Sequence, residues 1–462
     1  MSERRPYDSS TAVLESESGL TPKPPTSALG KLRGALPWAT KGGLAIVDQG
    51  LISGSNFLLG ILLARWLMPE QYGAYALAFS AFLLLSFLYH SLLLEPMAVF
   101  SGSTYHRSLR GYLGALVWIH LAITALTIVV LGSAAGVAFL RGEGNGLPGA
   151  LLGVTIASPC ILLFWLARRA YYMKLTPARA ASGALVYCVL LVSGLFLLFR
   201  RGMLSPLSAY VLMAVGALLT AAYLLAHLRK VLSSEVPGPS ARQAWDRHWD
   251  YGRWALASAV ATWIPYYMYY PLLSTFLGIA YAGQLRALMN LALPLEQTFT
   301  ALSCLFLPYA ARVKQEQGIA SVGFLTRRLT LLFVAGAGLY WLAIIPLKGQ
   351  VFHLLYGGKY LEVAYLLPYV AVETALWSAA FGPAIVLRAM ESPQTVFYAR
   401  CAASVLSLVL GIPLTLKYGL WGCIVGIIFS NAAAFIVTLY LLRRKVSVGT
   451  RILGGAAEAE AS

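Results

Sequence analysis

The chain alternates between long hydrophobic stretches and short polar loops, and twelve of the stretches are about as long as a bilayer is thick. A helix that crosses the hydrocarbon core needs roughly 20 apolar residues. The stretches are continuously apolar rather than alternating, which favours helices over the strands of a membrane barrel. The sequence therefore predicts an all-α membrane protein whose spans cover about 43–66, 74–99, 112–140, 148–167, 181–199, 205–228, 254–277, 284–309, 329–347, 363–387, 397–415 and 418–441.

The longest internal polar segment, residues 229–253, has six predicted spans before it and six after it. Two six-helix lobes that bind substrate between them are a common transporter plan. A weak internal repeat agrees with this plan, since Gly73 and Gly283 lie 210 residues apart and each opens the second helix of its half. We expect two lobes around a central cavity, in a chain divided into a disordered tail (1–40), an N-lobe (41–228), a linker (229–253), a C-lobe (254–445) and a second tail (446–462).

Composition supports the membrane assignment, and the basic residues indicate the orientation. Charged residues make up 11% of the chain and the mean hydropathy is +0.71, whereas a soluble domain is about 25% charged. With the N-terminus in the cytoplasm, 27 of the 35 Lys and Arg residues fall on the cytoplasmic side, as the positive-inside rule requires. The other eight are Arg65, Arg141, Arg200, Arg201, Arg286, Lys348, Lys359 and Lys417. The net charge of +17 is thus a topology signal, not a sign of nucleic-acid binding, and both termini are predicted to be cytoplasmic at a bacterial inner membrane.

The sequence lacks the patterns of an enzyme or a metalloprotein. Its five cysteines all lie in apolar stretches without paired spacing, so we expect them to be packing residues. No metal-ligand cluster, phosphate-binding glycine loop or carboxylate pair occurs in a polar segment, and the loops on the outer side are short. We therefore predict no catalytic residues, no metal and no cofactor other than a coupling ion.

Two runs of residues carry the most distinctive sequence. The run from Ala64 to Leu77 reads ARWLMPEQYGAYAL, and the run from Leu354 to Ala371 reads LLYGGKYLEVAYLLPYVA. Both resemble segments of the polysaccharide (O-antigen and exopolysaccharide) flippase family, which belongs to the multidrug/oligosaccharidyl-lipid/polysaccharide exporter superfamily. The resemblance covers about residues 40–445 and includes the twelve-helix count. In the first run, Pro69 and Gly73 are interpreted as architectural, because they break the chain between antiparallel helices.

The resemblance implies a function, whereas hydropathy alone indicates only a transporter. The family members look like translocators that carry an undecaprenyl-pyrophosphate-linked oligosaccharide across the inner membrane by alternating access, for exopolysaccharide or O-antigen biosynthesis. The implied partners are this lipid, membrane lipids, and polysaccharide polymerase and export proteins. Three alternatives stay open: a cation-coupled multidrug exporter of the same superfamily, a membrane-embedded glycan polymerase or ligase, and a non-transporting scaffold. The short outer loops argue against the polymerase.

Polar side chains inside the predicted spans are the candidates for a substrate cavity, because a polar group at mid-membrane usually faces a cavity or a partner. Gln49, Ser53 and Asn56 share one face of the first span, with Asp48 beside them. The alternative is that they join helices, as polar residues do inside membranes. In the seventh span, Pro265 and Pro271 predict a bend. The tyrosines around that bend, which could contact both the hydroxyls and the C–H faces of a sugar, are Tyr266, Tyr267, Tyr269 and Tyr270.

Charged residues suggest two further roles. Asp48, Glu296 and Glu373 are predicted to lie deep in the membrane, where a carboxylate without a partner would bind a proton or Na⁺. The alternative is an ion pair with a cation from another helix. Four arginines at the predicted cytoplasmic ends of spans are candidates for binding the lipid diphosphate, because a guanidinium group matches the geometry of phosphate. They are Arg168, Arg169, Arg253 and Arg388.

Overall fold

A computed structural model describes residues 28–144, 146–174, 176–231, 236–390 and 393–461, and all regular structure in these residues is helical. Most of the predicted N-terminal tail, residues 1–27, lies outside the described residues. The helices are α1 (Ala28–Trp66), α2 (Pro69–Tyr89), η1 (His90–Leu94), α3 (Glu95–Gly102), α4 (Leu109–Leu140), α5 (Leu147–Met173), α6 (Pro177–Arg200), α7 (Pro206–Val231), α8 (Ala241–Tyr267), α9 (Tyr269–Phe276), α10 (Ile279–Asn290), α11 (Leu293–Ile344), α12 (Lys348–Tyr356), η2 (Leu361–Leu366), α13 (Leu367–Ala389), α14 (Pro393–Leu406), η3 (Ser407–Gly411) and α15 (Ile412–Ala461).

Nine helical segments in the described part of the chain are long and apolar enough to cross a membrane. The first six, from Gly43–Trp66 to Pro206–Leu228, coincide with the first six predicted spans. The last two predicted spans fall within one segment, Gln394–Ser447. This segment contains a π-helical turn at Ser407–Gly411 and a kink at Gly419, where φ is 62°. The predicted spans 254–277 and 284–309 are not among the nine.

Those two predicted spans differ because helices break inside them. The bend predicted between Pro265 and Pro271 is confirmed, since α8 ends at Tyr267 and α9 begins at Tyr269. The helix α8 also starts thirteen residues before the predicted span, at a capping box of Ser240 and Gln243. Further along, α10 ends at Asn290 and the 52-residue α11 follows.

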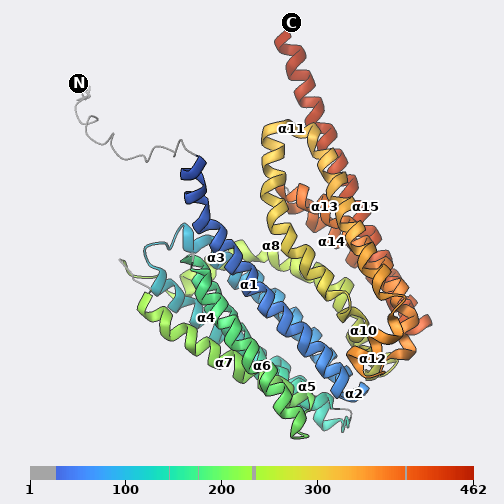
Figure 1. Ribbon diagram of the computed structural model, residues 1–462. Helices are drawn as coiled ribbons and strands as arrows, with labels where there is room; N and C mark the ends of the chain where they lie inside the picture. The colour runs from blue at the N-terminus through green and yellow to red at the C-terminus, as the bar shows by residue number, and fades with distance from the viewer. Residues whose placement is uncertain (1–27, 145, 175, 232–235, 391–392, 462) are drawn as a thin grey trace, which may run out of the picture.

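The first seven helices lie on one side of the molecule and α10–α15 lie on the other (Figure 1). The helix α8 contacts α2 and α4 as well as α14, so it connects the two sides. The sides meet at the end of the molecule opposite the chain termini, where α2 packs on α10 and α1 packs on α12 (Figure 1). We call this the closed end, formed by residues 64–73, 279–290 and 354–362.

Glycines allow a close approach of two helices at the closed end. A Cβ atom at Gly73 of α2 would overlap the carbonyl oxygen of Ile279 at the start of α10. A Cβ atom at Gly283 of α10 would lie 3.0 Å from the Gly73 nitrogen and 3.0 Å from the Pro69 oxygen. Next to this crossing, the Asn290 side chain donates a hydrogen bond of 2.8 Å to the Tyr72 hydroxyl. The two glycines that suggested a repeat in the sequence therefore touch across the molecule.

At the closed end, each half of the chain also places a cationic side chain at the C-terminal end of a helix in the other half. The Lys359 ammonium group donates hydrogen bonds to the carbonyl oxygens of Arg65, at 2.9 Å, and Leu67, at 2.6 Å, where α1 ends. In return, the Arg65 guanidinium group donates to the carbonyl oxygen of Leu354 in the last turn of α12. Both contacts are favourable because the carbonyl groups at a helix C-terminus lack partners and carry partial negative charge. These four residues all belong to the two distinctive runs or adjoin them.

The N-terminal part of α8, which precedes the predicted span, packs on the first half of the chain through His248. The Nδ1 atom of this buried histidine lies 2.9 Å from the carbonyl oxygen of Leu92, which can only accept, so Nδ1 carries the proton. Its Nε2 atom then accepts a hydrogen bond of 2.7 Å from the Tyr112 hydroxyl. Burial lowers the pKa of His248, opposed in part by the Leu92 hydrogen bond. The neutral form is therefore the one that fits this junction.

Candidate functional site

The first cluster of interest surrounds Asp48, which is fully buried on α1. The Arg168 guanidinium group on α5 donates two hydrogen bonds to the Asp48 Oδ2 atom, from Nη2 at 2.8 Å and from Nε at 3.0 Å. The Tyr172 hydroxyl donates to the same oxygen at 2.5 Å. Asp48 Oδ1 is buried without a hydrogen-bond partner among the described residues. This arrangement is the ion pair that the sequence left open as an alternative to coupling, and it also engages Arg168, a candidate phosphate ligand.

The other polar residues of the first span bridge the two halves of the chain. Gln49 donates a hydrogen bond of 3.2 Å to the Ser53 hydroxyl, and that hydroxyl donates one of 2.8 Å to Gln297 on α11. Asn56 is half-buried on the same helix. Gln49 and Gln297 are exposed. The hydrogen bonds join α1 to α11, which is the helix-joining role that the sequence left open as the alternative to a substrate cavity.

The second cluster is a chain of hydrogen bonds around Glu373 on α13, whose side chain is buried. Asn431 on α15 donates to Glu373 Oε1 at 2.7 Å, and Thr374 donates to Oε2 at 3.1 Å. The other end of the Asn431 amide, Oδ1, accepts a hydrogen bond of 2.6 Å from the Tyr266 hydroxyl. Arg400 Nη1 lies 3.3 Å from the same hydroxyl and donates to it. Four helices thus contribute to one network that connects a guanidinium group to a carboxyl group.

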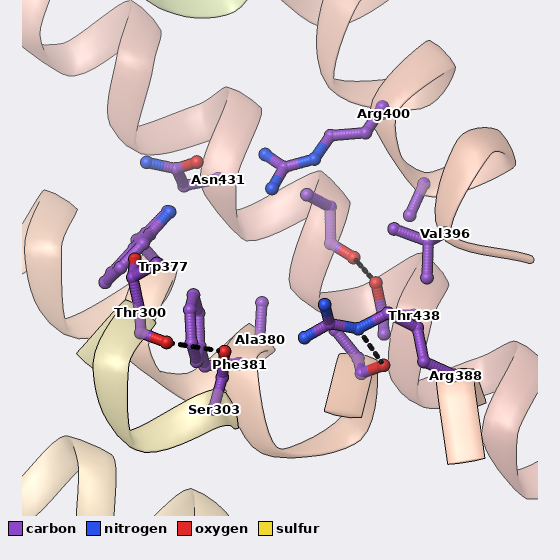
Figure 2. A pocket seen from close by; sticks show the side chains of 13 residues that line it. Thr300, Ser303, Trp377, Ala380, Phe381, Arg388, Val396, Arg400, Asn431 and Thr438 are labelled. Carbon is purple, nitrogen blue, oxygen red and sulfur yellow. Dashed lines mark hydrogen bonds between the residues drawn. The ribbon is translucent and has the colours of Figure 1, made fainter. Parts of the chain in front are cut away.

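A cavity of about 240 Å³ adjoins this network among α11, α13, α14 and α15. Figure 2 shows Arg388 and Arg400 extending into it from two neighbouring helices, with Asn431 beside Arg400. Aromatic rings, hydroxyl groups, an amide and small aliphatic side chains form the rest of the wall, and none of the 13 described lining residues is acidic. Those residues are Thr300, Ser303, Trp377, Ala380, Phe381, Ala384, Arg388, Val396, Ala399, Arg400, Asn431, Ala434 and Thr438. The cavity therefore has a positive wall and a neutral one.

The remaining predicted residues are distributed around these clusters. Tyr266 and Tyr267 are half-buried, whereas Tyr269 and Tyr270 are buried in the hydrophobic core. Glu296 is half-buried on α11, near enough to Glu373 and Arg286 to interact with them electrostatically. Of the four predicted phosphate ligands, Arg388 lines the cavity, Arg168 binds Asp48, Arg169 is half-buried and Arg253 is exposed.

The structure also brings in residues that the sequence argument used only for topology or did not use. Arg286 was counted among the basic residues of the outer side. It lies on α10 with its Nε atom buried, and its guanidinium carbon is 4.7 Å from the centre of the Phe79 ring on α2. Arg400 was counted as a basic residue at a span end, yet it lines the cavity. Asn431 could have been found, because it is a polar residue in the middle of the last predicted span.

No protein-family model matches the chain, and no curated protein matches it in sequence. Solved structures do match. An inward-facing multidrug resistance MATE transporter of the MOP superfamily superposes with a TM-score of 0.73 at 13% identity, over 88% of this chain and 99% of that one. The chain has the fold of the MOP-superfamily transporters.

Two further solved structures of MOP-superfamily proteins also match this chain. The lipid II flippase MurJ, in an inward closed conformation, matches with a TM-score of 0.63 at 13% identity, over 89% of this chain and 87% of that one. An outward-facing MATE transporter matches with a TM-score of 0.61 at 13% identity, over 89% and 95% of the two chains. These neighbours are a multidrug resistance transporter and a lipid II flippase. At this identity the likeness concerns the fold, and it does not select the polysaccharide branch.

Proposed function

We propose that the protein translocates an undecaprenyl-pyrophosphate-linked oligosaccharide across a bacterial inner membrane, for exopolysaccharide or O-antigen assembly. In this proposal twelve spans form two lobes, both termini are cytoplasmic, and the lobes open alternately to the two sides. The MOP fold supports the coarse part, since its members include the lipid II flippase MurJ. The two runs that resemble polysaccharide flippases support the finer part, because they contact each other at the closed end.

The conformation of the chain fits one step of such a cycle. Helices of the two halves meet at the end opposite the termini, and the MATE transporter on which the chain superposes better is the inward-facing one. With the termini in the cytoplasm, the closed end faces outward and the opposite ends of the two halves face the cytoplasmic leaflet. A lipid made in that leaflet would then be able to enter.

The observation that carries the choice of substrate is the placement of Arg286. Its Nε atom is buried without a hydrogen-bond partner among the described residues, and it forms no ion pair within 4 Å there. A cation inside the membrane is costly unless it has a partner, so such residues mark substrate pathways. A diphosphate is a suitable partner because an arginine binds phosphate through several parallel hydrogen bonds.

The proposal is tested by reconstituting the protein in liposomes and measuring flipping of a fluorescent lipid-linked oligosaccharide. Arg286→Gln should abolish flipping and Arg286→Lys should retain part of it. The exposed Arg141→Gln is the matched control and should behave as wild type. If the wild-type protein does not flip the lipid but extrudes cationic drugs, the multidrug alternative holds instead.

That alternative has its own support. The MATE structure gives the higher TM-score, 0.73 against 0.63 for MurJ. The two functions differ in the charge of the substrate. A diphosphate lipid needs cationic side chains inside the protein, whereas a cationic drug needs carboxylates. Glu296 and Glu373 could serve that purpose if they were ionised. The drug-efflux arm of the liposome experiment separates the two functions directly.

We further propose that Glu373 and Glu296 bind the coupling proton or Na⁺. The Asn431 amide holds one Glu373 oxygen and the Thr374 hydroxyl holds the other, which orients the carboxyl group whether it is charged or neutral. Asp48, the third predicted coupling residue, would have to exchange its Arg168 partner for a cation. Arg169 and Arg253 remain proposed contacts of the lipid diphosphate at the entrance.

A further inference from the structure

We propose that the cavity among α11, α13, α14 and α15 binds an anionic sugar, meaning a saccharide that carries a phosphate or a carboxylate. This inference deepens the proposed function, whose substrate contains sugar and phosphate, and it rests on that function. The cavity volume of about 240 Å³ equals roughly eight water molecules at about 30 Å³ each. It is therefore larger than a site for a single ion and suits part of a saccharide.

The anion would bind between Arg388 and Arg400, whose guanidinium groups extend into the cavity from α13 and α14 (Figure 2). A guanidinium group has five N–H donors in a planar fork that matches carboxylate and phosphate. Arg400 uses Nη1 for a long contact of 3.3 Å with the Tyr266 hydroxyl, which leaves it other donors for a ligand. None of the lining residues in the described part of the chain is acidic, so the cavity wall favours an anion over a cation.

The sugar ring would lie against the aromatic wall. The Trp377 and Phe381 rings have centroids 4.6 Å apart, and Phe299 stacks behind Trp377 at 6.2 Å with an interplanar angle of 4°. This packing fixes the Trp377 ring as a rigid apolar surface for the C–H face of a sugar. The hydroxyl groups of Thr300 and Thr438 and the amide group of Asn431 line the same cavity, where they would meet the sugar hydroxyls. Few polar groups set among aromatic rings are the usual composition of a ligand site.

The location also argues against a purely structural role for this cavity. Charged groups within membrane helices are expensive and are retained mainly where they serve a pathway. Asn431, which lines the cavity, also binds Glu373, so a ligand that contacts Asn431 adjoins the proposed coupling carboxyl group. Binding of the anion and protonation of Glu373 would then influence each other through one shared amide.

The test measures binding of soluble sugars to the purified full-length protein in detergent by isothermal titration calorimetry. The probes are glucose 1-phosphate, glucuronate and, as the uncharged control, glucose. We expect at least one of the two anionic sugars to bind and glucose to bind at least about tenfold more weakly, since hydrogen bonds to charged groups contribute most. Binding of glucose 1-phosphate alone would assign the site to the lipid phosphate, and binding of glucuronate alone would assign it to an acidic residue of the glycan. If neither anionic sugar binds, the proposal is wrong.

Variants locate the binding site. Arg388→Gln and Arg400→Gln should each weaken binding of the anionic sugar by about tenfold or more. Arg400→Lys should bind it more weakly than wild type and more tightly than Arg400→Gln. Arg388 is exposed, so its variant should fold even if the Arg400 variant does not. Arg443→Gln, which removes an exposed charge from the same helix as Asn431, should bind as wild type. Unchanged binding in both Gln variants would overturn the assignment, whereas sugar binding by a protein that flips no lipid would contradict the proposed function alone.

Discussion

Replacing Gly73 by alanine should open the closed end without destabilising the fold. The added Cβ atom would overlap the Ile279 carbonyl oxygen and lie 2.7 Å from the Ile279 carbonyl carbon, so α2 and α10 would have to separate. Overpacking of this kind costs about 1–3 kcal/mol, and it applies only where the two helices cross. Such an energy changes a two-state population by about 5- to 150-fold. Alanine also favours a helix over glycine by up to about 1 kcal/mol in every conformation, which should offset any general loss of stability.

The assay is a distance measurement between spin labels at Met203 and Lys417, two exposed positions chosen on opposite halves, with the native cysteines replaced. We expect the wild type to populate mainly the short distance and Gly73→Ala to shift toward a longer one. Gly136→Ala is the matched control, because a Cβ atom there meets nothing within 4 Å. If Gly73→Ala gives the wild-type distance distribution, the glycine crossing does not determine closure and the reasoning fails.

The remaining predictions concern topology, the two acidic clusters and pH. Reporter fusions at residues 20, 240 and 450 should report the cytoplasm and those at 70, 144 and 280 the outside; a reversed pattern would exclude the proposed orientation. Asp48→Asn should lower the stability of the purified protein by about 3 kcal/mol, because it leaves Arg168 without its Asp48 carboxylate partner. The double variant Asp48→Asn/Arg168→Gln should recover part of this loss. An Asp48→Asn variant as stable as wild type would contradict the ion pair. Glu373→Gln should keep its contacts and stability but abolish the response of liposome transport to an imposed proton or Na⁺ gradient, and a preserved response would remove the coupling role. Burial lowers the pKa of His248 in the folded protein, so its contribution to stability is complete above the ordinary histidine pKa of 6.5 and is lost as pH falls below that value. Thermal denaturation from pH 7 to 5 should therefore show a smaller decline in stability for His248→Asn than for wild type. Equal declines in the two proteins would refute this prediction.

Hydropathy predicts the first six spans because each is a continuous apolar run within one continuous helical segment. The predicted spans 254–277 and 284–309 are interrupted, since helices break at Met268 and between Asn290 and Leu293. Those breaks depend on proline and on packing against other helices, and a window of average hydropathy does not detect them. The bend itself was predictable from Pro265 and Pro271, because proline removes a backbone donor.

The sequence predicts which single residues of the site are buried, but not which residues they contact. Burial of Asp48 and Glu373 follows from their place in apolar runs, and the structure confirms it. Their partners do not follow, because Arg168 is 120 residues from Asp48 and Asn431 is 58 residues from Glu373. Which helices become neighbours is decided by packing of whole surfaces, so a single sequence cannot pair such residues. Arg286 shows the same limit, since its position near a loop gave no sign that α10 carries it inward.

The contacts of cationic side chains with helix C-termini at the closed end determine how this end responds to pH. Lys359 and Arg65 donate to main-chain carbonyl oxygens, not to carboxylates. Carbonyl oxygens do not titrate, and lysine and arginine are protonated throughout the acidic range. A closure built on carboxylates would loosen when the medium acidifies, whereas these contacts are indifferent to acid. They also use only the main chain of Leu67 and Leu354, so the two hydrogen-bond acceptors do not depend on the charge of any acidic side chain.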